Sequence, residues 1–178
     1  MNNPLWRLFS GTVRSVNQFM AYISAALIVI CSFVLVYEVI TRYVVSVSND
    51  WVIELSIFML IAATFLAAAH TQRERGHVGI EVLDEVMSRN ATRYRIMLGD
   101  ILSMLFCGLV AYLSGHYGLE AWEGQWTTSS TWGPPLWIPY GFMALGMLML
   151  TLEFFIQVVH GLAGAAPELP SHSHVKGD

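Results

Sequence analysis

Residues 16–37 read VNQFMAYISAALIVICSFVLVY, a run of 22 uncharged residues. A helix of that length extends about 33 Å, which is enough to cross the hydrocarbon core of a bilayer. Residues 51–69 read WVIELSIFMLIAATFLAAA and contain one charge, Glu54, in 19 residues. A short polar corner, residues 42–50, joins the two runs. Because so short a soluble chain could not bury both, the pair predicts an integral membrane protein.

The composition of the whole chain agrees with this interpretation. Of 178 residues, 55% are hydrophobic and only 12% are charged, whereas a soluble domain carries about 25% charged residues. Only helices and closed barrels satisfy their backbone in lipid, and the alternation typical of barrel strands is absent. We therefore predict an all-α protein with a single four-helix membrane domain, residues 1–160, and a flexible tail, residues 161–178. The predicted transmembrane helices cover about 16–43, 51–70, 96–119 and 136–159.

Two further segments have the pattern of amphipathic helices. In residues 4–19 the apolar positions recur at spacings near three and four, which indicates either a short helix in the headgroup layer or an extension of the first transmembrane helix. Residues 78–87 alternate apolar and acidic side chains and predict a second short interfacial helix.

The positions of the basic residues predict the orientation. Eight of the nine lysines and arginines precede the first span, lie between the second and third, or follow the fourth. Residues 43–50 and 120–135 contain none. The positive-inside rule then places both termini in the cytoplasm. The opposite face would carry a belt of five interfacial anchors: Trp51, Trp122, Trp126, Trp132 and Trp137.

Charges near the ends of the spans require partners. Glu38 and Arg42 lie four residues apart on one helix face, and Glu54 lies just across the corner, so we predict a structural ion pair among Glu38, Arg42 and Glu54. Asp100 and Glu153 are expected to be neutralised by arginines of the third span or by a partner chain. Small residues four apart predict close helix contacts: Ala63 with Ala67, and Ala111 with Gly115.

The sequence contains no nucleophile elbow, phosphate-binding glycine loop, paired-cysteine zinc motif or HExxH signature. The middle of each span also lacks charge, so neither catalysis nor independent transport is predicted. One alternative stays open. His70 and His160 end the second and fourth spans at similar depth, and two such histidines could ligate a haem in a membrane cytochrome.

Several motifs follow one another in an order and spacing that resemble a known family. They are Arg42-Tyr43 after the first span, Trp51 and Glu54 opening the second, His77-Val78 after it, and Pro135, Trp137 and Pro139 opening the fourth. Together they resemble the small membrane subunit, called DctQ or SiaQ, of the tripartite ATP-independent periplasmic (TRAP) transporters.

The resemblance implies a function and a set of partners. In this family a periplasmic substrate-binding protein (P-type) delivers an organic acid, typically a carboxylate, to a large membrane subunit (M-type) that moves it inward by secondary active transport. The coupling ion, sodium, is expected on that large subunit, and no cofactor is expected on this one. The small subunit would scaffold the large one in the bacterial inner membrane. Its partners would be these two proteins and membrane lipids, with no nucleic acid.

Overall fold

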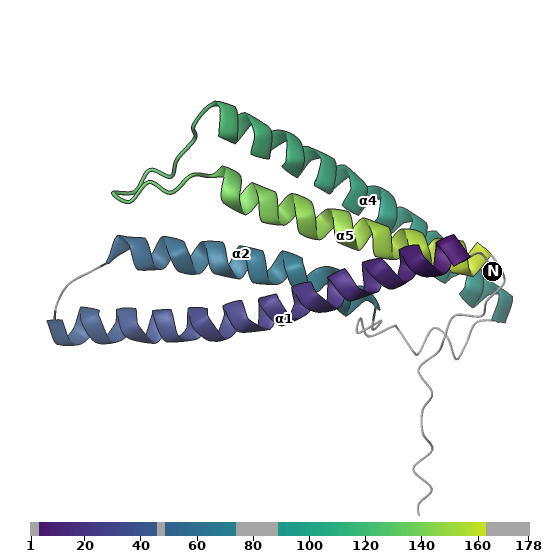
Figure 1. Cartoon of the computed structure of the whole chain (residues 1–178), viewed down its shortest axis with the longest axis horizontal. Coiled ribbons are helices and arrows are strands. Elements are labelled where there is room, and N and C mark those ends of the chain that lie inside the picture. The colour runs from purple at the N-terminus through teal and green to yellow at the C-terminus, as the bar shows by residue number, and fades with distance from the viewer. Residues whose placement is uncertain (1–3, 46–48, 74–88, 163–178) are drawn as a thin grey trace, which may run out of the picture.

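The structure is a computed structural model that describes residues 4–45, 49–73 and 89–162. It contains four long helices: α1 (Pro4–Ile40), α2 (Asp50–Arg73), α4 (Arg89–Glu123) and α5 (Trp137–Leu162). A short π-helix, η1 (Thr41–Val45), extends α1. All four are long and apolar enough to cross a membrane, which confirms the four predicted spans (Figure 1). Residues 78–87, the predicted second interfacial helix, lie outside the described residues.

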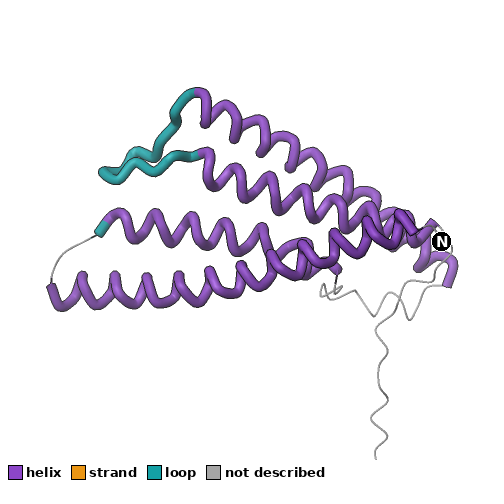
Figure 2. The backbone as a smooth tube through the Cα atoms, viewed as in Figure 1, coloured by secondary structure: helices purple, strands orange, loops and turns teal. Residues whose placement is uncertain are grey.

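The helices form two hairpins (Figure 2). One consists of α1 and α2, the other of α4 and α5, and α2 packs on α5 so that the packing order is α1, α2, α5, α4. The end of η1, the start of α2 and the residues between α4 and α5 lie at one end of the molecule, which we call the loop end (Figure 1). The N-terminus lies at the other, the terminal end. Figure 1 shows the hairpins close together at the terminal end and spread apart at the loop end.

Residues 4–19 form the first part of α1 and not a separate helix. Of the two interpretations open from the sequence, the extension of the first span is therefore the one observed. The physical reason is packing, because Val13, Asn17 and Met20 are all buried. Trp6 also makes an edge contact with the Phe155 ring, with 6.4 Å between the ring centroids.

The interior of the protein is small, as expected for a chain whose apolar faces meet lipid. Its core consists of Met20, Ala62 and Leu66, with Leu27, Phe142 and Met149 packed around it. Within the first hairpin, Ser24 Oγ donates a hydrogen bond to the Ala63 carbonyl at 2.6 Å. That short distance requires the two helices to approach closely, and Ala63, 1% exposed, permits it.

The contact between hairpins depends on a glycine that the sequence did not single out. Gly146 of α5 is buried against Phe65 of α2. A Cβ atom added at position 146 would lie 2.6 Å from the Phe65 carbonyl carbon and 2.7 Å from its Cβ. Because neither helix backbone can yield easily, glycine at this position allows the two hairpins to touch.

Candidate functional site

The corner, of which the structure describes residues 42–45, 49 and 50, is organised by a buried acid that precedes it. Glu38 is 6% exposed, and its Oε1 atom lies 3.6 Å from Arg42 Nε. The same oxygen accepts a hydrogen bond from the Asn49 backbone N–H at 3.5 Å. Asn49 Nδ2 also donates to Thr41 Oγ1 at 3.4 Å. Glu38 thus fixes both sides of the corner, since Thr41 and Arg42 precede the turn and Asn49 follows it.

Glu54, the third member of the predicted ion pair, is partly buried one turn into α2. Its Oε2 atom is buried and has no hydrogen-bond partner among the described residues. The structure therefore brings Glu38 and Arg42 together, while an ion pair that includes Glu54 stays a prediction.

Removing the Arg42 side chain should destabilise the corner. In Arg42→Ala, Glu38 would keep its hydrogen bond from the Asn49 N–H but lose its charged neighbour. Loss of such a partner by a buried carboxylate lowers the free energy of unfolding by about 1–3 kcal/mol. We expect a lower unfolding temperature in detergent and less protein in the membrane. Arg7→Ala, an exposed arginine at the terminal end, is the control, and equal behaviour of the two variants would contradict the prediction.

The loop, residues 124–136, is held by backbone hydrogen bonds. Trp126 N–H donates to the Ala121 carbonyl at 3.0 Å, and the Trp126 carbonyl accepts from Leu136 N–H at 2.9 Å. Thr128 N–H donates to the Pro134 carbonyl at 3.1 Å, so the two sides of the loop pair over a short distance. Gly133 has φ of +55°, a left-handed conformation that glycine adopts without strain. The loop is therefore a defined structure at the loop end.

The five predicted tryptophan anchors all lie at the loop end. Trp51 opens α2, Trp122 lies in the last turn of α4, Trp137 opens α5, and the remaining two belong to the loop. All five are exposed, between 39% and 55%. The rings of Trp122 and Trp137 meet edge to face, with centroids 5.0 Å apart. This pair ties the bases of α4 and α5 together beneath the loop.

The other described residues of the family-like motifs lie in the corner, in the loop and at the start of α5. Tyr43 is 82% exposed in the corner. Pro135 takes part in the isolated bridge with Thr127, and Pro139 lies in the first turn of α5, where a missing N–H is tolerated. His77 and Val78 lie outside the described residues.

At the terminal end, Glu153 of α5 finds a partner that sequence reasoning missed. It is 3% exposed, and its Oε2 accepts a hydrogen bond from Asn17 Nδ2 of α1 at 3.1 Å. The sequence predicts that arginines of the third span or a partner chain neutralise this acid. The partner observed is instead the neutral amide of Asn17, from the first hairpin. An asparagine within an apolar run was the available signal.

The two histidines of the haem alternative also lie at the terminal end. His70 Nδ1 is buried and has no hydrogen-bond partner among the described residues. The His160 ring lies against Trp6, with centroids 6.0 Å apart. No group of three or more His, Cys, Asp or Glu side chains in the described ranges could hold a metal ion.

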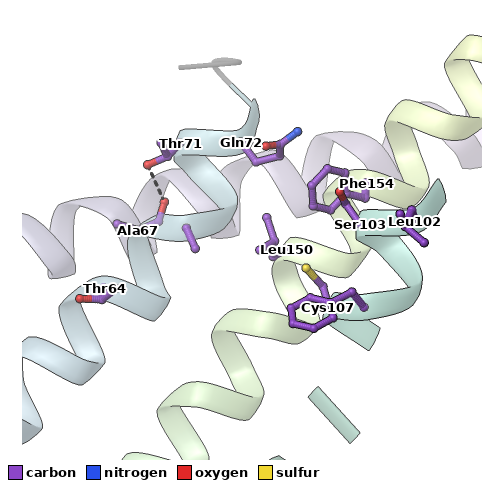
Figure 3. Close-up of a pocket in the computed structure, with 11 residues that line it drawn as sticks. Thr64, Ala67, Thr71, Gln72, Leu102, Ser103, Cys107, Leu150 and Phe154 are labelled. Atoms are coloured by element: carbon purple, nitrogen blue, oxygen red, sulfur yellow. Dashed lines mark hydrogen bonds between the residues drawn. The ribbon is translucent and has the colours of Figure 1, made fainter. Parts of the chain in front are cut away.

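A groove of about 750 Å³ lies among α2, α4 and α5 (Figure 3). Its lining comprises Thr64, Ala67, Ala68, Thr71, Gln72, Leu102, Ser103, Phe106, Cys107, Leu150 and Phe154. The Thr64 and Thr71 hydroxyls donate to carbonyls of their own helix, at 2.7 and 3.1 Å. None of these eleven residues is basic, so the groove presents no cation to a carboxylate.

These features define a class of protein: a multi-pass membrane protein of two helical hairpins, with its structured polar elements at one end. Comparison with known proteins supplies the family. The profile described as "Tripartite ATP-independent periplasmic transporters, DctQ component" matches residues 31–164. The chain belongs to this family, a family of transporter components and not of enzymes, and the resemblance drawn from the corner and the fourth span is confirmed.

A curated relative carries the same family name. The chain is 32% identical, over 124 residues, to the "C4-dicarboxylate TRAP transporter small permease protein DctQ" of Rhodobacter capsulatus. The aligned region is 70% of this chain and 53% of the relative. The chain therefore spans about half the length of the relative that it matches.

Proposed function

We propose that this chain is the small membrane subunit of a TRAP secondary transporter and scaffolds the large membrane subunit during ion-coupled uptake of an organic acid. A periplasmic binding protein would deliver that acid. The name of the R. capsulatus relative favours a C4-dicarboxylate. Family membership supports the role, and so does the groove, whose lining carries no basic residue for a carboxylate.

The observation that carries the scaffolding role is an exposed leucine face of α4, which borders the groove at Leu102. Leu98, Leu102, Leu105 and Leu109 are between 56% and 70% exposed. They are spaced by four, three and four residues, the spacing at which helices pack in left-handed pairs. The helix lies at the edge of the packing order, so this face is available to a helix of the large subunit.

The proposal includes an orientation. With the terminal end in the cytoplasm, the arginines outside the corner would lie on the cytoplasmic side of the inner membrane, as the positive-inside rule requires. The corner and the loop would then face the periplasm, where the binding protein docks. The tryptophans at their bases would hold the chain at a fixed depth. We call the corner and the loop together the docking surface.

Reconstitution tests this function. We expect the chain to co-purify with the large subunit encoded beside it, and uptake of a labelled C4-dicarboxylate into proteoliposomes to need the chain, the large subunit and the binding protein together. Uptake should fall to background when any one is omitted. Full uptake without this chain, or uptake by this chain alone, would refute the scaffolding role.

A matched pair of variants tests the α4 face. Replacing Leu102 and Leu109 together by alanine should reduce co-purification of the large subunit. The same change at two exposed apolar residues of α1, Ile30 and Phe33, is the control.

A further inference from the structure

The polar contacts between the two hairpins gather at the terminal end. Side-chain hydrogen bonds that join one hairpin to the other include the Asn17–Glu153 bond and two bonds between Gln72 and Gln157. Gln72 Nε2 donates to Gln157 Oε1 at 3.2 Å, and Gln157 Nε2 donates to the Gln72 carbonyl at 3.5 Å. Glu153 and Gln157 are one helical turn apart on α5, so the bonds form one group.

We propose that the Asn17–Glu153 hydrogen bond, with the Gln72–Gln157 pair beside it, is a clasp that fixes the angle between the two hairpins and thereby positions the corner relative to the loop. Asn17 and Glu153 are thus positioning residues for the docking surface at the opposite end of the molecule. The docking part of this inference rests on the proposed function, whereas the mechanical part does not.

Two rigid hairpins that are joined at separate points keep a fixed angle between them. The hairpins touch at the Gly146–Phe65 contact, in the apolar packing around it, and at the clasp, seven residues or about 10 Å from Gly146 along α5. If the clasp is lost, only apolar contacts without directional bonds remain, and the hairpins can rotate about the Gly146–Phe65 contact. The corner belongs to the first hairpin and the loop to the second, so any rotation changes the distance between them.

The length of the helices amplifies this rotation. From Gly146 to Trp137 at the start of α5 is about 14 Å along the helix, and from Phe65 to Trp51 at the start of α2 is about 21 Å. A rotation of about 5° about the Gly146–Phe65 contact moves the end of such an arm by roughly 1–2 Å. The hairpins are already spread apart at the loop end (Figure 1).

The burial of the clasp explains why two side chains can fix the angle between the hairpins. Asn17 is 0% exposed and Glu153 is 3% exposed, and a hydrogen bond to a carboxylate away from water is strong and directional. Asn17 Oδ1 has no partner among the described residues, so the amide is oriented by its single bond to Glu153. The bond therefore holds the two helices in one register.

Exchanging the amide of Asn17 and the carboxylate of Glu153 between the two positions tests the clasp directly. Asn17→Asp alone sets two carboxylates against each other and should break the clasp. Glu153→Gln alone retains an acceptor oxygen and should have a smaller effect. The double variant N17D/E153Q reverses the roles, because the glutamine amide can donate to the new aspartate, and should restore the clasp. Asn17→Ala removes the donor without adding charge and serves if N17D does not accumulate.

The readout is the distance between spin labels at Ile53→Cys on α2 and Gly141→Cys on α5, in the full complex, with Cys31 and Cys107 replaced by alanine. We expect the distance distribution of N17D and N17A to be at least twice as wide as that of the unmodified protein. N17D/E153Q should return to the unmodified width. Thr151→Val is the control, since the Thr151 hydroxyl bonds within its own helix, to the Met147 carbonyl at 2.7 Å.

The same variants in reconstituted uptake test the link to docking. The concentration of binding protein at half-maximal uptake should rise at least fivefold in N17D and N17A and recover in the double variant. If the distance distributions of N17D and N17A both matched that of the unmodified protein, the clasp would be refuted. If they widened while the binding-protein concentration at half-maximal uptake stayed unchanged, the role of the clasp in docking would be refuted. Failure of the proposed function is distinct, because uptake by the unmodified complex would then not depend on this chain.

Discussion

Replacing Gly146 with leucine is expected to separate the two hairpins, so that the purified protein is no longer stable and monodisperse in detergent. A side chain at this position would meet the Phe65 backbone closer than 3.0 Å, and both elements are long helices that cannot bend locally at low cost. Forcing extra atoms into a packed contact usually costs about 1–3 kcal/mol. For Gly146→Leu we expect the free energy of unfolding to fall by at least about 3 kcal/mol, and for Gly146→Ala by about half as much.

The measurement is thermal unfolding of the detergent-solubilised chain together with its elution volume. Gly141→Leu is a well-matched control, because position 141 lies on the same helix and a Cβ there would meet nothing within 4 Å. We expect the control to retain the elution volume and nearly all of the stability. If the two leucine variants behaved alike, the close approach of α2 and α5 at Gly146 would be wrong.

The sequence was sufficient for the elements that depend on local composition. The four spans, the corner between the first two and the gathering of tryptophans at one end all follow from runs of apolar residues and from the positions of charges. Such features need no knowledge of which helix packs against which, because the bilayer itself selects long apolar helices. The corner pair of Glu38 and Arg42 was accessible for the same reason, since four residues on one helix bring the side chains together.

The packing between hairpins was not accessible in this way. The small-residue rule selected Ala63 with Ala67 and Ala111 with Gly115. Ala63 does lie at a close contact, between α1 and α2 within the first hairpin, but a Cβ at Gly115 would meet nothing within 4 Å. The contact between hairpins instead uses Gly146. In a membrane helix nearly every face is apolar, so hydrophobicity does not reveal which face meets protein and which meets lipid.

The partner of Glu153 was missed for a related reason. A charge was expected to neutralise a charge, so basic residues were sought, whereas the closest partner is the neutral amide of Asn17 from the other hairpin. An isolated polar residue within an apolar span is a useful signal, because burying its amide without a hydrogen bond is costly. The sequence shows that such a residue needs a partner, but the three-dimensional packing decides which one.

Replacing Trp126 or Trp132 with aspartate is expected to weaken uptake at least tenfold while the complex still assembles. Both side chains are exposed at the loop end, 42% and 49%. Exposed tryptophans commonly dominate the energy of protein interfaces. A tenfold loss of affinity for the binding protein corresponds to about 1.4 kcal/mol of binding free energy. The loop itself should survive the change at Trp126, because this residue holds the loop through its backbone N–H and carbonyl.

The experiment measures uptake against binding-protein concentration for each aspartate variant and for the matching phenylalanine variant, which keeps an aromatic ring. If these residues contact the binding protein, aspartate should raise the half-maximal concentration and phenylalanine should change it less than threefold. A cysteine at Ser129, labelled from outside the cell, would establish that the loop faces the periplasm. A drop in co-purified large subunit would instead assign the tryptophans to assembly. Unchanged uptake would remove the loop from the docking surface and leave the corner as its remaining part.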